Sequence, residues 1–174
     1  MDNFNRFKLN GEEVKLYFGR YGNGNTSIQL YNLEGELYTT ITVNVCYLGN
    51  EDIVGVKNYS VNVGVDKFLI ENELVEKEVL NRIPRGYVEI PFYRLTNKAI
   101  KIRDEFSLLT DLYMSKSDED YFPELVLGIE NKILSGELSS KWVNVYEEYC
   151  KQNPPKTDNF SYIDLGELLL DKLT

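Results

Sequence analysis

Carboxylates are the residues of this chain that could do chemistry, because the sequence contains no histidine. Its 174 residues include 28 Asp and Glu against 19 Lys and Arg, which gives a formal net charge of −9. Histidine is the commonest general base and metal ligand, so its absence excludes Ser–His and Cys–His nucleophile pairs and histidine zinc sites. The negative charge also disfavours direct binding to nucleic-acid phosphates, which need Lys and Arg.

The carboxylates occur as adjacent pairs and one run, and neither pattern predicts catalysis. Neighbours on a helix point about 100° apart, so Asp104–Glu105 and Glu147–Glu148 do not converge on one substrate atom. The run Asp118–Glu119–Asp120 lacks the central Gly and distal Glu of a calcium loop. We interpret it as helix-start acids ahead of Pro123. No catalytic residue, metal ligand or cofactor is predicted.

The two cysteines and the glycine-rich turn also favour structural roles. Cys46 and Cys150 are far apart in the sequence, and without a secretory context such thiols are more often buried and unpaired than bridged. No imidazole is present to activate Cys150 as a nucleophile. The Gly22–Asn25 segment joins two predicted strands, whereas phosphate-binding loops join a strand to a helix.

The first half of the chain is predicted to be mainly strands. Val14–Phe18 and Ser27–Tyr31 flank Gly22–Asn25, a pattern typical of a hairpin. The stretch Leu37–Val45 alternates with a period of two and is rich in β-branched residues, which indicates a third, half-buried strand.

A short strand at Ile53–Lys57 and a helix of two to three turns capped by Asp66 are expected next. The strand Gly86–Leu95 follows. It is predicted to lie at a sheet edge, because Pro91 cannot donate a ladder hydrogen bond.

The second half has helical periodicity. Apolar residues recur at steps of three and four over Ala99–Tyr113, Phe122–Ile133, Trp142–Cys150 and Ile163–Leu173. Trp142 lies on such a stripe and is predicted to be buried.

These patterns together predict an α+β fold. We expect an antiparallel sheet of four or five strands with one inserted helix, followed by a C-terminal helical part of three or four helices. The predicted domains are a β-rich part, residues 1–96, and an acidic helical part, residues 97–174. The helical part is short enough to pack on the sheet as one compact unit.

Part of the β-rich half resembles a family of small proteins from phages, plasmids and conjugative elements whose function is unknown. The resemblance spans residues 21–95 approximately and rests on four segments: Ile28–Tyr31, Tyr38–Asn44, Lys57–Gly64 and Gly86–Leu95. Members often carry acidic residues where this chain has Asn58 and Val61. The resemblance implies a mobile-element origin. Because small mobile-element proteins often antagonise host defence, it suggests by analogy alone an anti-CRISPR type of role.

Charge distribution is the feature most directly relevant to function. Residues 104–148 hold 11 acids and only Lys116, Lys132 and Lys141. Such a surface can be steered onto a positively charged groove, although solubility alone accounts for a charge of this size. The predicted contact residues are acids and one tyrosine of this region: Asp104, Glu105, Asp118, Glu119, Asp120, Tyr121, Glu147 and Glu148.

The leading hypothesis is a non-enzymatic protein that binds and inhibits a host defence or nucleic-acid-processing complex. Its sharpest form is an anti-CRISPR that blocks a basic nucleic-acid-binding surface of a Cas effector. The expected partner is a host protein or ribonucleoprotein with a basic surface, with no direct nucleic-acid or membrane binding. The expected location is the cytoplasm of a bacterial host, because no signal peptide or membrane-length apolar run is present. Two alternatives stay open: a housekeeping accessory protein of a plasmid or conjugative element, and a carboxylate- or metal-dependent enzyme.

Overall fold

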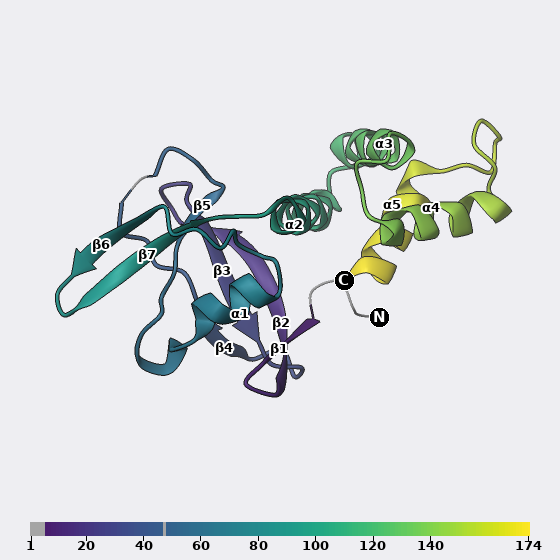
Figure 1. Cartoon of the computed structure of the whole chain (residues 1–174). Coiled ribbons are helices and arrows are strands. Elements are labelled where there is room, and N and C mark those ends of the chain that lie inside the picture. Colours follow the sequence, from purple (N-terminus) through teal and green to yellow (C-terminus); the bar gives the residue numbers. More distant parts are fainter. Residues whose placement is uncertain (1–5, 47) are drawn as a thin grey trace. The chain divides into compact units, whose positions relative to one another are not determined.

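The computed structural model describes residues 6–46 and 48–174, which form an α+β fold with a C-terminal helical part (Figure 1). Two compact units divide the chain between Asp104 and Glu105. This division lies inside helix α2 (Asn97–Ser115), after the expected boundary near residue 96. We call residues up to Asp104 the β-rich unit and residues from Glu105 the helical unit.

The first sheet of the β-rich unit is an antiparallel meander of β1 (Arg6–Leu9), β2 (Glu12–Arg20), β3 (Thr26–Tyr31) and β4 (Leu37–Thr40). The predicted hairpin and third strand are confirmed, and β1 is an additional edge strand. Gly24 stands in the β2–β3 turn with a φ of 87°, a left-handed value that costs glycine little.

Three further strands form a second sheet, so the strands divide between sheets of four and three members instead of joining one sheet of four or five. They are β5 (Ile53–Gly55), β6 (Asn81–Arg85) and β7 (Val88–Arg94), in the order β5-β7-β6. The short 3-10 helix η1 (Ser60–Asn62) and helix α1 (Val65–Glu71) connect β5 to β6.

The prediction that the strand with Pro91 lies at a sheet edge is wrong, because β7 is the central strand of its sheet. The carbonyl of Pro91 accepts a hydrogen bond from the Val56 amide at 2.9 Å. The nitrogen and carbonyl of a strand residue face the same side, so the missing donor of Pro91 faces the chain just past β5, which ends at Gly55. The proline therefore removes no hydrogen bond from the three-residue ladder between β5 and β7.

Two other details of the β-rich unit differ from the prediction. The expected strand Leu37–Val45 ends at Thr40, with Leu37 exposed and Thr42 buried. The polar side chain of Thr42 tolerates burial because its hydroxyl accepts a hydrogen bond from the Ile28 amide at 2.9 Å and also bonds to the Tyr21 hydroxyl. Helix α1 is preceded by Gly64 as its N-cap, with a φ of 88°, and Asp66 lies in its first turn.

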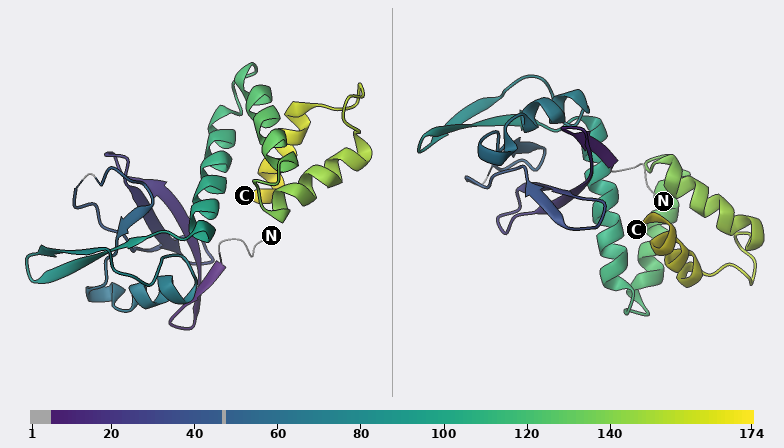
Figure 2. Two further views of the ribbon diagram at one scale, coloured as in Figure 1. Left: turned by 45° about the horizontal axis from the view of Figure 1, so that its top comes forward. Right: turned by 90° about the horizontal axis from the view of Figure 1, so that it is seen from below.

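The helical unit contains the C-terminal half of α2 and the helices α3 (Tyr121–Leu134), α4 (Ser140–Gln152) and α5 (Tyr162–Leu173). The four predicted helical segments are therefore confirmed, and Figure 2 shows them from two further sides. Most residues of the stripes after residue 104 meet in one core, whose most buried members are Leu112, Val126, Ile129, Trp142, Leu165 and Leu169. Tyr113 and Ile163, which belong to the predicted stripes, are exposed instead. Trp142 is only 2% exposed, as predicted.

Gly166 allows α3 and α5 to approach closely. A Cβ atom at this position would lie 2.6 Å from the Phe122 ring and 2.7 Å from Val126. Real side chains do not tolerate such distances, so the packing of these two helices depends on the missing side chain.

Candidate functional site

The turn between α2 and α3 brings the predicted contact residues Asp118 to Tyr121 together, and we call residues 111–124 the α2–α3 corner. The Asp118 amide donates to the Ser115 carbonyl at 2.8 Å, which closes the turn. The Asp118 carboxylate accepts hydrogen bonds from the amides of Asp120 and Tyr121, at 3.2 and 2.9 Å. Asp118 thus bonds the amides of the N-cap residue Asp120 and of the first helical residue Tyr121, and it stabilises the start of α3, as expected for an acid ahead of Pro123.

Three large apolar side chains are exposed on this corner. Tyr113 is 68% exposed, Met114 73% and Tyr121 52%. Tyr113 and Met114 follow the buried Leu112, and Tyr121 precedes the buried Phe122. Because neighbouring residues on a helix point in different directions, these three side chains face away from the core. Soluble proteins seldom expose several large apolar side chains within so short a segment unless those side chains contact a partner.

Carboxylates surround the apolar side chains. Five acids of the corner are exposed: Asp111, Asp118, Glu119, Asp120 and Glu124. The only basic residue is Lys116, whose ammonium lies 3.6 Å from the Glu167 carboxylate. Tyrosine and methionine are enriched in the centres of interfaces, and the acids supply a negative rim. The corner can therefore bind a basic surface that has an apolar centre.

Other predicted contact residues lie elsewhere. Asp104 belongs to the β-rich unit and is exposed, with its carboxylate 3.0 Å from the Arg103 guanidinium. Glu147 and Glu148 are exposed on α4, where the Glu148 carboxylate lies 3.8 Å from Lys172. These acids contribute to the charge of the molecule without belonging to the corner.

The prediction that Glu105 is a contact residue is wrong, because its side chain is buried. It is only 1% exposed, and its carboxylate accepts hydrogen bonds from the amide and hydroxyl of Ser139, at 2.6 and 2.9 Å. Ser139 is the N-cap of α4, so Glu105 holds the start of that helix. A buried carboxylate with this structural role cannot lie on a contact surface.

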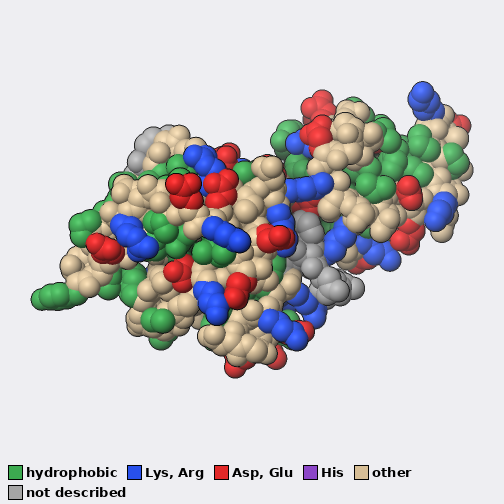
Figure 3. Space-filling view, viewed as in Figure 1, with side chains coloured by type: hydrophobic (Ala, Val, Ile, Leu, Met, Phe, Trp, Pro, Cys, Tyr) green, Lys and Arg blue, Asp and Glu red, His purple; other side chains and the backbone are tan. Residues whose placement is uncertain are grey.

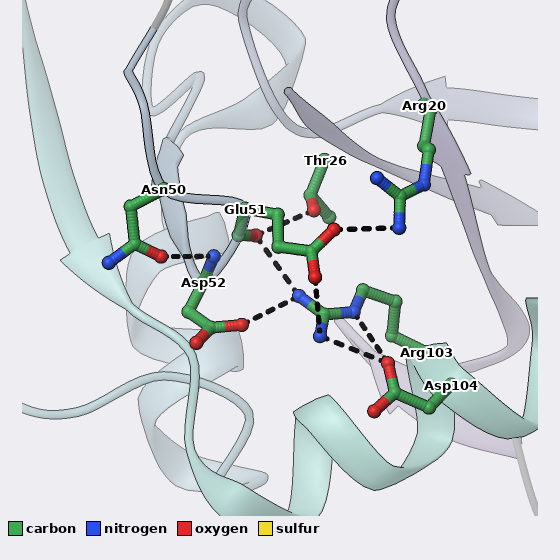
Figure 4. Close-up of polar contacts among 7 residues, drawn as sticks. All are labelled: Arg20, Thr26, Asn50, Glu51, Asp52, Arg103 and Asp104. Carbon is green, nitrogen blue, oxygen red and sulfur yellow. Dashed lines mark hydrogen bonds and ion pairs between the residues drawn. The ribbon is translucent and has the colours of Figure 1, made fainter. Parts of the chain in front are cut away.

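The β-rich unit has a buried cation, Arg103, held by several oxygens (Figure 4). Its guanidinium donates to Asp52 at 2.7 Å and to the Glu51 carbonyl at 3.2 Å, and it also contacts Asp104. Burial opposes the charge, but the hydrogen bonds that Arg103 donates to Asp52 and Asp104 outweigh it and raise the Arg103 pKa. This network joins the first half of α2 to the segment that holds Glu51 and Asp52.

A buried carboxylate in the helical unit was missed by the sequence analysis. Glu130 is 7% exposed and accepts hydrogen bonds from the hydroxyls of Tyr146 and Tyr162, at 2.6 and 2.9 Å. Burial raises the pKa of both phenols, and the bonds to Glu130 raise it further. Glu130 lies four residues after Val126 on the apolar stripe of α3, which was the available signal.

The thiols offer no activated nucleophile. Cys150 is half-buried, and burial raises the pKa of its thiol, which keeps it protonated near neutral pH. Cys46 is exposed, contrary to the expectation of a buried thiol, and both cysteines are free. Among the described residues no group of three or more His, Cys, Asp or Glu side chains could hold a metal ion.

Comparison of the chain with protein-family models, with curated proteins and with solved structures finds no match. Within the described part of the chain, none of the helices has the length and apolar character needed to cross a bilayer.

Proposed function

We propose that this protein is a non-catalytic binding protein whose α2–α3 corner docks on a basic surface of a host protein or ribonucleoprotein. The single observation that carries the proposal is the exposure of Tyr113, Met114 and Tyr121 among five exposed acids. The acids attract a basic surface from a distance and orient the approach. The apolar side chains then supply the short-range contacts that hold it.

A surface that is both basic and apolar in its centre is typical of proteins that bind nucleic acid, since phosphates need cations and bases need stacking partners. Occupation of that surface by the corner would exclude the nucleic acid. In its sharpest form, the proposal is an anti-CRISPR that blocks the nucleic-acid-binding surface of a Cas effector. The resemblance of residues 21–95 to a family from phages and plasmids supports a mobile-element origin, and the anti-defence role remains an analogy.

Purified full-length protein should compete with nucleic acid for its partner. We would titrate it into guide-loaded Cas effectors bound to labelled target DNA and follow DNA release by fluorescence anisotropy. The expected result is release from at least one effector, with an affinity that weakens as salt increases. Binding that leaves the DNA in place would contradict the competitive part of the proposal.

Two matched variants locate the contact. Glu119→Ser with Asp120→Ser removes two charges from the corner and spares Asp118, whose carboxylate bonds the start of α3, whereas Glu147→Ser with Glu148→Ser removes the same charge from α4. We expect the corner variant to slow association several-fold and the α4 variant to have a much smaller effect. Equal effects would mean that the whole negative field, and no particular surface, steers binding.

Removal of the apolar side chains should act on dissociation. Tyr113→Ser with Tyr121→Ser leaves the charge unchanged, so encounter stays fast while the complex dissociates at least about ten-fold faster, as expected for interface anchors. Unchanged dissociation in a folded double variant would exclude the corner as the contact surface.

A carboxylate- or metal-dependent enzyme is the less favoured alternative. The described carboxylates form no metal-binding group, and the buried Glu130 is occupied by two phenols. The accessory-protein alternative predicts binding to a plasmid or conjugation protein in place of a defence complex. The same corner variants test whether that binding uses this surface.

A further inference from the structure

Met114 exposes a thioether side chain within the α2–α3 corner. It lies in the last turn of α2 and is 73% exposed, between the exposed Tyr113 and the buried Ser115. On the face drawn in Figure 3, hydrophobic side chains of the helical unit reach the surface among Asp and Glu side chains. The chain has one other methionine, Met1, which lies outside the described residues. Small molecules can therefore reach the Met114 side chain in the folded protein.

Among the sulfur and indole side chains of residues 6–46 and 48–174, Met114 differs in exposure and in chemistry. Trp142 is only 2% exposed, and burial raises the pKa of the Cys150 thiol, which favours its unreactive protonated form. Cys46 is exposed, but a thiol reacts as its thiolate, so its reaction depends on pH. A thioether has no proton to lose, so Met114 can react with an oxidant at any pH near neutral.

We propose that Met114 is a reversible oxidation site that regulates the α2–α3 corner, with hydrogen peroxide as the oxidant. The thioether sulfur donates an electron pair to one peroxide oxygen, so an S–O bond forms while the O–O bond breaks. The other oxygen leaves as hydroxide and takes the proton of the transferred oxygen, which gives water. Sulfur is oxidised by two electrons to the sulfoxide, and the peroxide is reduced.

The charge of the corner favours a neutral oxidant. The five exposed acids of the corner repel anions. The single base of the corner, Lys116, lies 3.6 Å from the Glu167 carboxylate, so it does not offset these acids. Hydrogen peroxide carries no charge and meets no such barrier.

Oxidation changes the surface of the corner without disturbing the core beneath it. The sulfoxide is polar, whereas the thioether is apolar and flexible. The core contact of this helical turn is Leu112, which is fully buried, so oxidation of the exposed Met114 alters no packed side chain. Stability should hardly change, because surface modifications seldom cost much. The apolar surface that Met114 forms with Tyr113 and Tyr121, however, loses one of its three members.

Loss of that apolar side chain should weaken the binding of a partner. A polar oxygen must shed water when it enters an apolar interface, and it regains a hydrogen bond only if the partner supplies a donor. This consequence rests on the proposed function of the corner, whereas the oxidation itself needs no partner. Methionine sulfoxide reductases restore the thioether with electrons from a thiol and release the oxygen as water, so the change is reversible.

Mass spectrometry and hydrophobic interaction chromatography of the full-length protein test the oxidation site. The background is Cys46→Ser, which removes the exposed thiol. With hydrogen peroxide, the peptide that contains Met114 should gain one oxygen atom at a rate close to that of N-acetylmethionine amide. The oxidised protein should elute earlier, and its thermal midpoint by circular dichroism should be unchanged. The two sulfoxide reductases, one for each epimer, should restore the original elution in the presence of dithiothreitol.

Two variants at position 114 attribute the change in elution. Met114→Leu keeps an apolar side chain and should elute at the same position before and after peroxide, although Met1 can still react. Met114→Gln places a polar group on a side chain of similar length and should elute early without peroxide. The proposal is overturned if the folded protein gains no oxygen at Met114, if elution of the oxidised protein is unchanged, or if Met114→Leu shifts as much as its parent.

The DNA-release titration separates this inference from the proposed function. On an effector from which the unmodified protein releases DNA, the oxidised protein and Met114→Gln should dissociate several-fold faster, and Met114→Leu should be unaffected by peroxide. Equal dissociation of the oxidised and unmodified protein would overturn the regulatory role. Release of DNA from no effector would instead contradict the proposed function, while the chromatography still decides whether Met114 is a reversible oxidation site.

Discussion

The two units of the chain bury charges in opposite ways. The β-rich unit buries a cation, Arg103, and surrounds it with the carboxylates of Asp52 and Asp104. The helical unit buries an anion, Glu130, and its two described partners are the neutral phenols of Tyr146 and Tyr162. The first arrangement cancels charge within the unit, whereas the second satisfies hydrogen bonds and leaves the negative charge in place.

This difference shows how one unit acquires an unbalanced field. Neutral donors allow the helical unit to stay folded around a carboxylate without adding a cation to its surface. Its exposed acids are then not offset by buried bases, and the field reaches outward by about a Debye length, roughly 8 Å at physiological salt. Arg103 instead neutralises acids that belong to its own unit.

Among the substitutions that probe the two units, loss of Trp142 should lower the unfolding free energy most. Trp142→Ala removes the largest buried side chain of the helical core and should cost about 4 kcal/mol of unfolding free energy. Circular dichroism in denaturant would follow the helices, while a dye on the exposed Cys46 would follow the β-rich unit. The dye transition should shift less than the helical one. Equal shifts would show that the two units unfold together.

Gly166→Ala tests the close approach of α3 and α5. The added methyl group would meet Phe122 and Val126 at distances that force the helices apart, at a cost of about 2 kcal/mol. Fluorescence of Trp142, the only tryptophan, reports this unit. Gly128→Ala is the matched control, because its Cβ would meet nothing within 4 Å and alanine favours the helix. The control should be neutral or stabilising, and a destabilised control would undermine the packing argument.

Arg103→Met breaks the buried ion-pair network of the β-rich unit. Removal of one partner from a buried pair is costly, but Asp52 and Asp104 are partly exposed and regain water, so we expect about 2 kcal/mol. The dye on Cys46 measures the change. Arg20→Met is the comparison, because Arg20 lies at the surface, on the outer side of the same network, where it pairs with Glu51 and should contribute well under 1 kcal/mol. Similar losses in both variants would mean that the burial of Arg103 is unimportant.

Tyr146→Phe removes one of the neutral hydrogen-bond donors of Glu130. It should have the smallest effect, a loss of about 1 kcal/mol of unfolding free energy at neutral pH. Burial raises the Tyr146 pKa above its ordinary value of 10.0. The folded state therefore holds the phenolic proton when the unfolded state has lost it, so stability is constant below about pH 10 and falls as pH rises further. The variant should show a shallower alkaline fall in Trp142-monitored stability. If stability fell equally steeply with alkaline pH in the variant, Tyr146 would not be the group whose proton loss causes the fall.

Local periodicity made the helical unit predictable. Its stripes follow three- and four-residue steps, and the burial of Trp142 and the position of Asp118–Asp120 at the start of a helix follow from neighbours in the sequence. The burial of Glu105 escaped prediction because it depends on Ser139, which is distant in the sequence. Adjacent acids such as Asp104 and Glu105 look alike in sequence, although one is exposed and the other buried.

The β-rich unit was less predictable because its pairing is non-local. Asn81–Arg85 has no apolar alternation and contains a proline, so nothing local marks it as β6. Without β6, the strand with Pro91 is predicted at a sheet edge, whereas β6 makes it the central strand. The α2–α3 corner was found only in part, because the exposure of Tyr113 and Met114 depends on which side of α2 meets the core.

The contact at Gly166 also constrains how the sequence can diverge. Most core positions accept another apolar residue of similar volume, but position 166 accepts no side chain while Phe122 and Val126 keep their places. A distant homologue with the same helix spacing should therefore keep glycine there, or change residues 122 and 126 together with it. For a chain whose comparisons find no match, this linked trio is a practical criterion for recognising remote relatives.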